Sequence, residues 1–134
     1  MYIERVEIKN FRCFDDKGVT FLFNKGVNAI IGENNTGKSA LVDALKIAFT
    51  ILNYNREVYF SLNDFHIDIR GERASNAQID VYLKEVPLHQ IDLWNPEDPD
   101  TGEFHIFFWV DKLLGGTERV RSKIWGGRSE GNTL

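Results

Sequence analysis

Residues 32–39 read GENNTGKS and fit the spacing G-x-x-x-x-G-K-S, whose chemistry is the binding of phosphate. The glycines Gly32 and Gly37 allow positive φ and a close approach of backbone N–H groups to phosphate oxygens. Lys38 is expected to reach the β- and γ-phosphates of a nucleotide, and the Ser39 hydroxyl is expected to ligate Mg²⁺. The predicted nucleotide-binding residues of this loop are Gly32, Glu33, Asn34, Asn35, Thr36, Gly37, Lys38, Ser39 and Ala40.

In phosphate-binding proteins such a loop follows a strand and leads directly into a helix. Residues 27–31 are a short apolar run, which predicts a strand covered on both faces. From Lys38 the apolar period changes to that of a helix, whose N-terminus adds a partial positive charge to the site. The apolar face of this helix is predicted to hold Leu41, Leu45, Ala48 and Leu52, widened by Val42, Ala44 and Phe49.

Alternating apolar and polar residues predict the other strands, at residues 5–9, 19–23, 79–83 and, as a hairpin, 104–125. Turn residues between the first strands make the sheet start antiparallel. Residues 56–76 are predicted to be mostly loop, with a short helical turn at residues 61–64, and the Pro- and Asp-rich residues 87–102 a surface loop. The predicted fold class is α/β, with a mostly antiparallel N-terminal sheet, a phosphate loop, one long helix and a β-rich arm.

Composition excludes several classes of protein. A chain of 134 residues is long enough for one domain with a hydrophobic core. A net charge of −4 excludes a uniformly basic protein that coats nucleic acid, but it does not exclude a local basic patch. Cys13 is the single cysteine, so no disulfide framework or cysteine-rich zinc site forms within the chain. No apolar run approaches the roughly 20 residues of a membrane span and no signal peptide is evident, so a cytoplasmic protein is expected.

The nucleotide base is predicted to be adenine. The guanine-recognition pattern Asn-Lys-x-Asp is absent, because the nearest match, residues 24–27, ends in Val27. An antiparallel strand pair before the loop also differs from kinases and small GTPases, which place the loop after their first strand. We therefore expect ATP and Mg²⁺ as cofactors.

The segments IERVEIKNFRCF and GVNAIIGENNTGKSALVDAL resemble the N-terminal lobe of the ABC-type ATPases of DNA metabolism, such as RecF and SMC, and most of all the OLD (overcoming lysogenization defect) family. The resemblance is strong over residues 1–52 and loose over residues 54–134, where Asp64-Phe65 and a β-rich arm are similar. It implies a partial ABC-type ATPase lobe, with residues 1–134 as the N-terminal part of the ATPase domain of a longer protein. It also implies DNA, the remainder of the domain and a second copy in a homodimer or higher oligomer as partners, and a Toprim endonuclease that serves phage defence or DNA repair.

In such ATPases the loop after the first strand lies over the nucleotide, and Asn10, Phe11, Arg12 and Phe14 match that loop. The resemblance makes Arg12 a candidate contact for phosphate or ribose and Phe14 a candidate neighbour of adenine. A solvated charge at the strand end is the alternative for Arg12. A core aromatic that caps the first hairpin is the alternative for Phe14.

Other parts of the family pattern are missing. No apolar strand ends in the Asp-Glu pair of a Walker B element, and residues 126–129 resemble the signature in letters but lack a following helix pattern. The histidines His66, His89 and His105 read as surface or core residues, and Gln90 lies in a predicted loop. We therefore expect no catalytic residue in this chain, weak nucleotide binding by the chain alone, and no turnover.

Three alternatives stay open. The chain fits a non-hydrolysing nucleotide-sensing or interaction module, with Phe107 and Trp109 as a partner surface, if those side chains are exposed. It also fits an SMC- or RecN-like repair ATPase without a nuclease, or a transporter ATPase subunit. Basic residues near the C-terminal hairpin are either contacts for DNA phosphates or solvated charges; they are Arg119, Arg121, Lys123 and Arg128.

Overall fold

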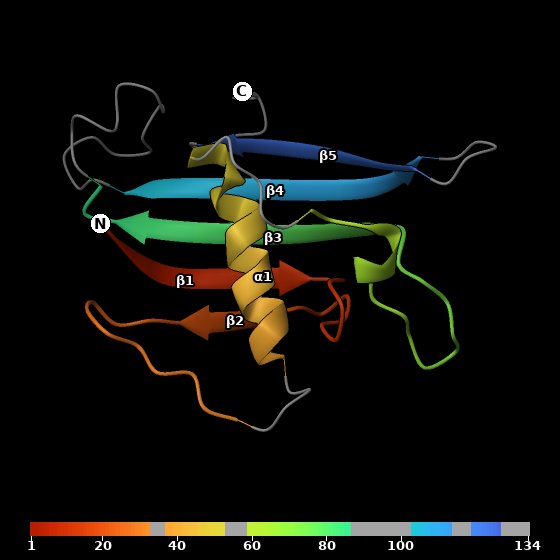
Figure 1. The fold of residues 1–134 in the computed structure, drawn as a ribbon, viewed down its shortest axis with the longest axis horizontal. Coiled ribbons are helices and arrows are strands. Elements are labelled where there is room, and N and C mark those ends of the chain that lie inside the picture. The colour runs from red at the N-terminus through yellow and green to blue at the C-terminus, as the bar shows by residue number, and fades with distance from the viewer. Residues whose placement is uncertain (33–36, 53–58, 87–102, 114–118, 127–134) are drawn as a thin grey trace.

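In the described part of the chain, the core is a five-stranded antiparallel sheet with a helix across one face (Figure 1). The computed structural model describes residues 1–32, 37–52, 59–86, 103–113 and 119–126. The strands lie in the order β2-β1-β3-β4-β5. In chain order the elements are β1 (Tyr2–Lys9), β2 (Val19–Leu22), α1 (Lys38–Ala48), the 3₁₀ turns η1 (Phe49–Leu52) and η2 (Leu62–Asp64), β3 (Asn76–Lys84), β4 (Phe104–Leu113) and β5 (Arg119–Gly126). This architecture confirms the predicted antiparallel sheet, long helix, short turn before residue 65 and C-terminal hairpin.

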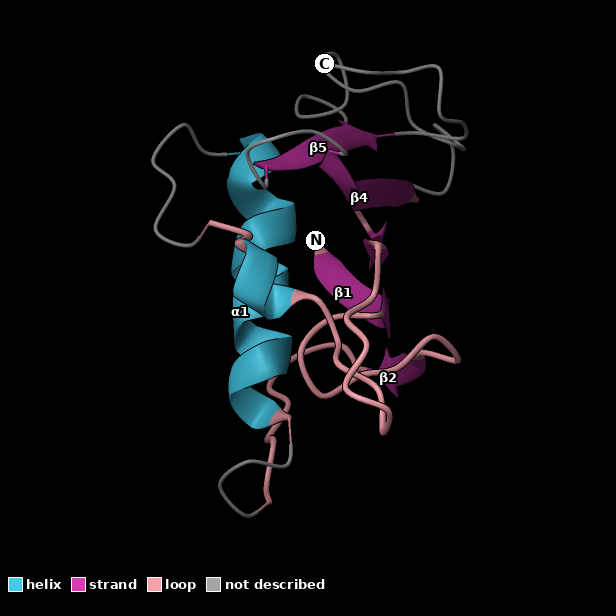
Figure 2. Ribbon diagram, turned by 90° about the vertical axis from the view of Figure 1, so that its right-hand side faces the viewer, coloured by secondary structure: helices cyan, strands magenta, loops and turns pink. Residues whose placement is uncertain are grey.

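The helix α1 lies across one face of the sheet (Figure 2). The apolar half of each alternating strand is buried on that face. Val6 of β1 lies opposite Val81 of β3, and both are fully buried. From the helix, Leu41, Ala44 and Ile47 are buried against this face. Burying one large aliphatic side chain contributes about 1.5–3 kcal/mol, so the sheet–helix contact is a main source of stability.

An aromatic cluster joins the loop after β1 to the segment after α1. The backbones of Phe11 and Phe65 form an isolated antiparallel bridge, and both side chains are buried. The Phe60 ring centroid lies 4.9 Å from that of Phe65 and 5.6 Å from that of Phe11. Phe108 of β4 completes the cluster, 6.1 Å from Phe60. Residues 60–65 are therefore fixed to the sheet although they belong to no strand.

The predicted strand at residues 27–31 is wrong. These residues have no regular secondary structure, and Val27 and Ile31 are 98% and 93% exposed. A strand needs a neighbour for its backbone N–H and C=O groups, and the described residues give this segment no strand to pair with. Val42 also differs from expectation, because it is exposed on α1, whereas Ala44 is buried. The helix itself ends at Ala48, four residues earlier than its apolar pattern.

The opposite face of the sheet holds a buried acid beside a buried histidine. Asp80 Oδ2 accepts a hydrogen bond of 2.8 Å from Gln78, and Asp80 Oδ1 lies 3.8 Å from His105 Nε2. The His105 ring stacks on Tyr82, with centroids 3.7 Å apart. Burial raises the pKa of Asp80 to about 6, against the opposing effect of the Gln78 hydrogen bond. Burial and the charge of Arg5 lower the pKa of His105 to about 3, so this histidine is a neutral, buried residue.

Asp80→Asn is expected to stabilise the fold at pH 8 and to have little effect at pH 4. The folded-state pKa of Asp80 lies above its ordinary value of 3.8, so the folded protein loses stability as the pH rises from about 4 through 6. Asparagine removes a cost of up to about 3 kcal/mol at pH 8 and keeps a partner for Gln78. Urea unfolding of both proteins at the two pH values measures the difference.

Asp111→Asn is the control for this pH effect, because Asp111 pairs with the exposed Arg121 on the β4–β5 hairpin. An exposed ion pair contributes about 0–1 kcal/mol, so this variant should change the free energy of unfolding by less than Asp80→Asn does at pH 8. A destabilisation by Asp80→Asn of equal size at both pH values would contradict the titration of Asp80.

Candidate phosphate-binding site

The N-terminus of α1 presents backbone N–H groups that have no partner within the helix. Gly37 is its N-cap, with φ 98° and ψ 1°, and the Gly37 carbonyl accepts the first helical hydrogen bond from Leu41 at 2.9 Å. Among the described residues, no side chain caps the helix. The N–H groups of Lys38, Ser39 and Ala40 therefore have no partner within the helix, and the helix dipole makes this end attractive to an anion. The positive φ predicted for Gly37 is confirmed.

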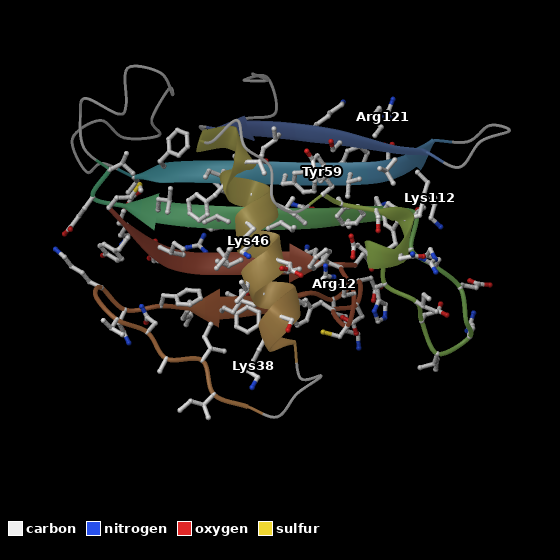
Figure 3. All side chains as sticks on the ribbon, viewed as in Figure 1. Arg12, Lys38, Lys46, Tyr59, Lys112 and Arg121 are labelled. Atoms are coloured by element: carbon white, nitrogen blue, oxygen red, sulfur yellow. The ribbon has the colours of Figure 1, made fainter. Side chains whose placement is uncertain are left out.

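The first three side chains of α1 differ in exposure and in their contacts. The Lys38 ammonium donates a hydrogen bond to the carbonyl of Gly32 and so bridges the two ends of the loop; Figure 3 shows Lys38 at the N-terminal end of α1. Ser39 is exposed, which leaves its hydroxyl accessible. Ala40 is buried in the core, so it can offer only its N–H group. Glu33, Asn34, Asn35 and Thr36 lie outside the described residues.

Phe14 packs against the phosphate loop from the side of the first hairpin. A Cβ atom built on Gly37 would lie 2.9 Å from Phe14 Cζ, so the ring closely approaches that glycine. The Phe14 ring also meets Phe21 of β2 edge-on, with centroids 5.8 Å apart. These contacts favour the core interpretation of Phe14, in which it caps the first hairpin. Its contact with adenine stays a prediction.

Arg12 is held by two carboxylates. Its Nη1 lies 2.5 Å from Asp43 Oδ2 and its Nε lies 2.9 Å from Asp64 Oδ1. Partial burial alone lowers the pKa of Arg12, but the hydrogen bonds to Asp43 and Asp64 outweigh it, and the pKa lies above its usual value. Arg12 is therefore not a solvated strand-end charge, and its contact with phosphate or ribose stays a prediction. No sequence signal singles out Asp43, which reads as one polar residue of an amphipathic helix.

The loop that carries Arg12 has an unusual backbone. Asn10 and Arg12 have φ values of 57° and 51°, a left-handed conformation that non-glycine residues adopt at a cost of about 1–2 kcal/mol each. Asp64 and His66 hold it in place: the carbonyl of Asp64 accepts from Arg12 N–H at 2.7 Å, and His66 N–H donates to the Asn10 carbonyl at 3.0 Å. His66 Nδ1 lies 2.6 Å from the Arg12 carbonyl oxygen and donates to it in the matching tautomer. His66 thus fixes this loop.

The donor set fits a nucleotide with Mg²⁺. Mg²⁺ in nucleotide sites binds few protein ligands and keeps waters and substrate phosphates, so one exposed hydroxyl at Ser39 is sufficient. Among the described residues no group of three or more His, Cys, Asp or Glu side chains could hold a metal ion by itself. A depression of about 540 Å³ near Asn10, Asp68 and Arg73 lies beside the Arg12 loop and includes no predicted nucleotide-binding residue. No helix in the described part is long and apolar enough to span a membrane.

The C-terminal hairpin gives little support to the predicted partner surfaces. Arg121 pairs with Asp111 at 2.8 Å, and the Lys123 ammonium lies 6.0 Å from the centroid of the Trp109 ring. Phe107 and Trp109 lie on the face opposite α1 and are half-buried, closer to ordinary packing than to an exposed surface. The Arg119 side chain, Arg128, His89 and Gln90 lie outside the described residues.

The chain is similar in sequence to one protein family and to ATPases of known name. The sequence profile of the family described as AAA ATPase domain matches residues 1–127. The DNA double-strand break repair Rad50 ATPase of Archaeoglobus fulgidus is 38% identical over 128 residues, which is 84% of this chain and 12% of the relative. The chromosome partition protein Smc of Pyrococcus furiosus is 46% identical over 44 residues, or 33% of this chain and 4% of the relative. The chain therefore spans only a small part of the length of these curated relatives.

Solved structures agree in fold. A structure from work on ATP-driven dimerization and DNA-stimulated activation of SMC ATPases has a TM-score of 0.68 at 23% identity, over all of this chain and 72% of that one. The Smc head domain with a coiled coil and joint from Pyrococcus yayanosii has a TM-score of 0.67 at 24% identity, over 99% of this chain and 23% of that one. At these identities the likeness shows the fold alone. Because the profile of the AAA ATPase domain family matches residues 1–127, the chain belongs to this family, and it has SMC and Rad50 ATPases as homologues.

Proposed function

We propose that residues 1–134 are the N-terminal part of an ABC-type ATPase domain that binds ATP and Mg²⁺ at the N-terminus of α1 and acts on DNA. The observation that carries this proposal is the helix N-terminus after Gly37, which no described side chain caps, with Lys38 and the exposed Ser39 in its first turn. Backbone N–H groups would bind phosphate oxygens, Lys38 would neutralise the β- and γ-phosphates, and Ser39 would ligate Mg²⁺. Bound Mg²⁺ supplies neutralisation of the charge that develops during phosphoryl transfer.

Hydrolysis would need residues that this chain does not supply. We place the Walker B carboxylates and the signature in the remainder of the ATPase domain, and a second copy opposite the phosphate loop in a homodimer or higher oligomer. The dimerization driven by ATP that is described for SMC ATPases supports this arrangement. By itself the chain should bind nucleotide weakly and should not turn it over.

Two versions of the full-length protein differ in whether a nuclease is joined to the ATPase domain. The OLD-like version couples the ATPase to a Toprim endonuclease in phage defence, and rests on the resemblance of the first 52 residues. The second version is a repair or chromosome ATPase of SMC or RecN type without a nuclease, and the similarity to Rad50 and Smc favours it. Divalent-metal-dependent cleavage of plasmid DNA by the purified full-length protein supports the first version, and ATPase activity without cleavage supports the second.

Lys38→Ala in the full-length protein tests the nucleotide site. Because Lys38 is the cation expected to neutralise the β- and γ-phosphates, its loss should weaken ATP binding at least tenfold, about 1.4 kcal/mol, and abolish hydrolysis. A fluorescent ATP analogue titrated in the presence of Mg²⁺ measures binding, and phosphate release measures turnover. Lys46→Ala is the matched control, since Lys46 is an exposed lysine in the last turn of the same helix. Unchanged binding and turnover in Lys38→Ala would exclude this site.

A further inference from the structure

The two ion pairs of Arg12 use only part of its guanidinium. Asp64 accepts from Nε and Asp43 accepts from Nη1. A guanidinium carries five N–H donors in a rigid plane, so two bonds at different nitrogens fix its position and orientation. Within the described residues Nη2 makes no hydrogen bond, which leaves its two donors available for an anion.

Asp43 ties Arg12 to the helix that begins at the phosphate loop. It lies four residues after Ser39 on α1, and residues spaced by four share one face of a helix, about 6 Å apart along the axis. Asp43, which holds the guanidinium, therefore lies about one helix turn from Ser39, the predicted Mg²⁺ ligand. Figure 3 shows Arg12 beside α1, on the side of the segment that carries η2.

Asp64 is itself held rigidly. Its Oδ2 accepts from the Ser61 backbone N–H at 2.9 Å and from the Ser61 hydroxyl at 3.3 Å, in a capping box at η2. Its Oδ1 is left to bind Arg12, and the carboxylate is largely buried. Because the carboxylate is already ordered, holding Arg12 there costs less conformational entropy than holding it with a mobile surface acid.

From this geometry we infer that Asp43 and Asp64 are positioning residues, which hold the guanidinium of Arg12 beside α1 so that its Nη2 donors contact the nucleotide bound at the phosphate loop. This inference rests on the proposed function. The opposite role is a definite alternative: one guanidinium between two carboxylates has a net charge of −1, and a pair that sequesters Arg12 would oppose nucleotide binding. The two roles predict opposite signs when Asp43 is neutralised.

A double-mutant cycle with Arg12→Ala, Asp43→Asn and the double variant tests the inference in the full-length protein. A fluorescent ATP analogue with Mg²⁺ is the probe, and its dissociation constant is the readout. If Asp43 acts through Arg12, Asp43→Asn weakens binding about three- to tenfold, and it weakens binding no further in the Arg12→Ala background. A merely structural role of Asp43 would instead add to the effect of Arg12→Ala.

Two further variants complete the experiment. Asp43→Glu keeps the charge and should recover part of the affinity lost in Asp43→Asn, and it gives a second measurement if Asp43→Asn folds poorly. Asp111→Asn removes the ion pair to Arg121 on the β4–β5 hairpin, which has no contact with Arg12 or Asp43 among the described residues, and should leave the dissociation constant unchanged. Asp64 is left intact because its substitution also breaks the Ser61 capping box.

The inference is overturned if Asp43→Asn binds the probe as tightly as the unmodified protein or more tightly, or if its effect adds fully to that of Arg12→Ala. Failure of the proposed function gives a different pattern, because Lys38→Ala would then bind the probe like the unmodified protein. If Lys38→Ala loses binding while the double-mutant cycle shows no coupling between Arg12 and Asp43, the nucleotide site stands and only the positioning role of Asp43 is excluded.

Discussion

Gly37→Ala should weaken the binding of ATP and Mg²⁺ at least tenfold and destabilise the fold by about 1–3 kcal/mol. Gly37 has φ 98°, which L side chains rarely adopt, and a new Cβ would lie 2.9 Å from Phe14 Cζ and 3.3 Å from Cys13 Sγ. The helix start or the Phe14 ring must therefore shift, and either shift moves the N–H groups that would bind phosphate. Thermal unfolding and titration with a fluorescent ATP analogue measure the two effects.

Gly26→Ala is the matched control for that substitution. Gly26 has nearly the same φ, 99°, but a Cβ atom added to it would meet no described atom within 4 Å. It should therefore show the backbone strain without the steric clash and keep nucleotide affinity. Adding Phe14→Leu to Gly37→Ala relieves part of the clash. Equal losses of affinity in the two glycine variants would show that the contact with Phe14 has no role.

Phe65→Ala is expected to lower the free energy of unfolding by about 3–5 kcal/mol. The Phe65 side chain is 1% exposed and packs against Phe60, and its backbone bridges to Phe11. A small domain has a total stability of about 5–15 kcal/mol, so this loss removes a large part of it. Urea unfolding followed by circular dichroism gives the measurement.

Tyr59→Ala is the control for the aromatic cluster, because Tyr59 precedes Phe60 and is 66% exposed. Exposed substitutions usually change stability by about 0.5 kcal/mol or less. Similar destabilisation by Tyr59→Ala and Phe65→Ala would show that residues 59–65 are not held by the buried cluster.

The strands and the helix that were predicted correctly are those whose apolar residues repeat at the spacing of a strand or of a helix. Val6 and Ile8 alternate with charged residues, and the strand follows because one face of β1 is buried under α1. Residues 27–31 have no alternation, so their apolar character indicated burial but could not identify a partner. The structure leaves them exposed, which is a property of the tertiary pairing and not of the local sequence.

In the candidate site, too, some residues could be predicted from the local sequence and others could not. Gly37, Lys38 and Ser39 were predictable because their chemistry lies in consecutive residues. The environment of Arg12 was not, because Asp43 and Asp64 lie 31 and 52 residues away and meet it only through the fold. His105 is buried, which agrees with the core interpretation that the sequence left open beside a surface one, whereas no sequence signal indicated the burial of Asp80.

The strand order has a consequence for how the chain folds. The pairing of Lys9 with Gln78 closes a loop that contains β2, the phosphate loop, α1 and η2. Such non-local pairing is slow, because the entropy of closing the loop must be lost before its contacts form. The helix that begins at Lys38 has no complete sheet to pack on until β3 reaches β1. We therefore expect a chain on the ribosome to form the stable N-terminus of α1 only after residues 76–84 have emerged.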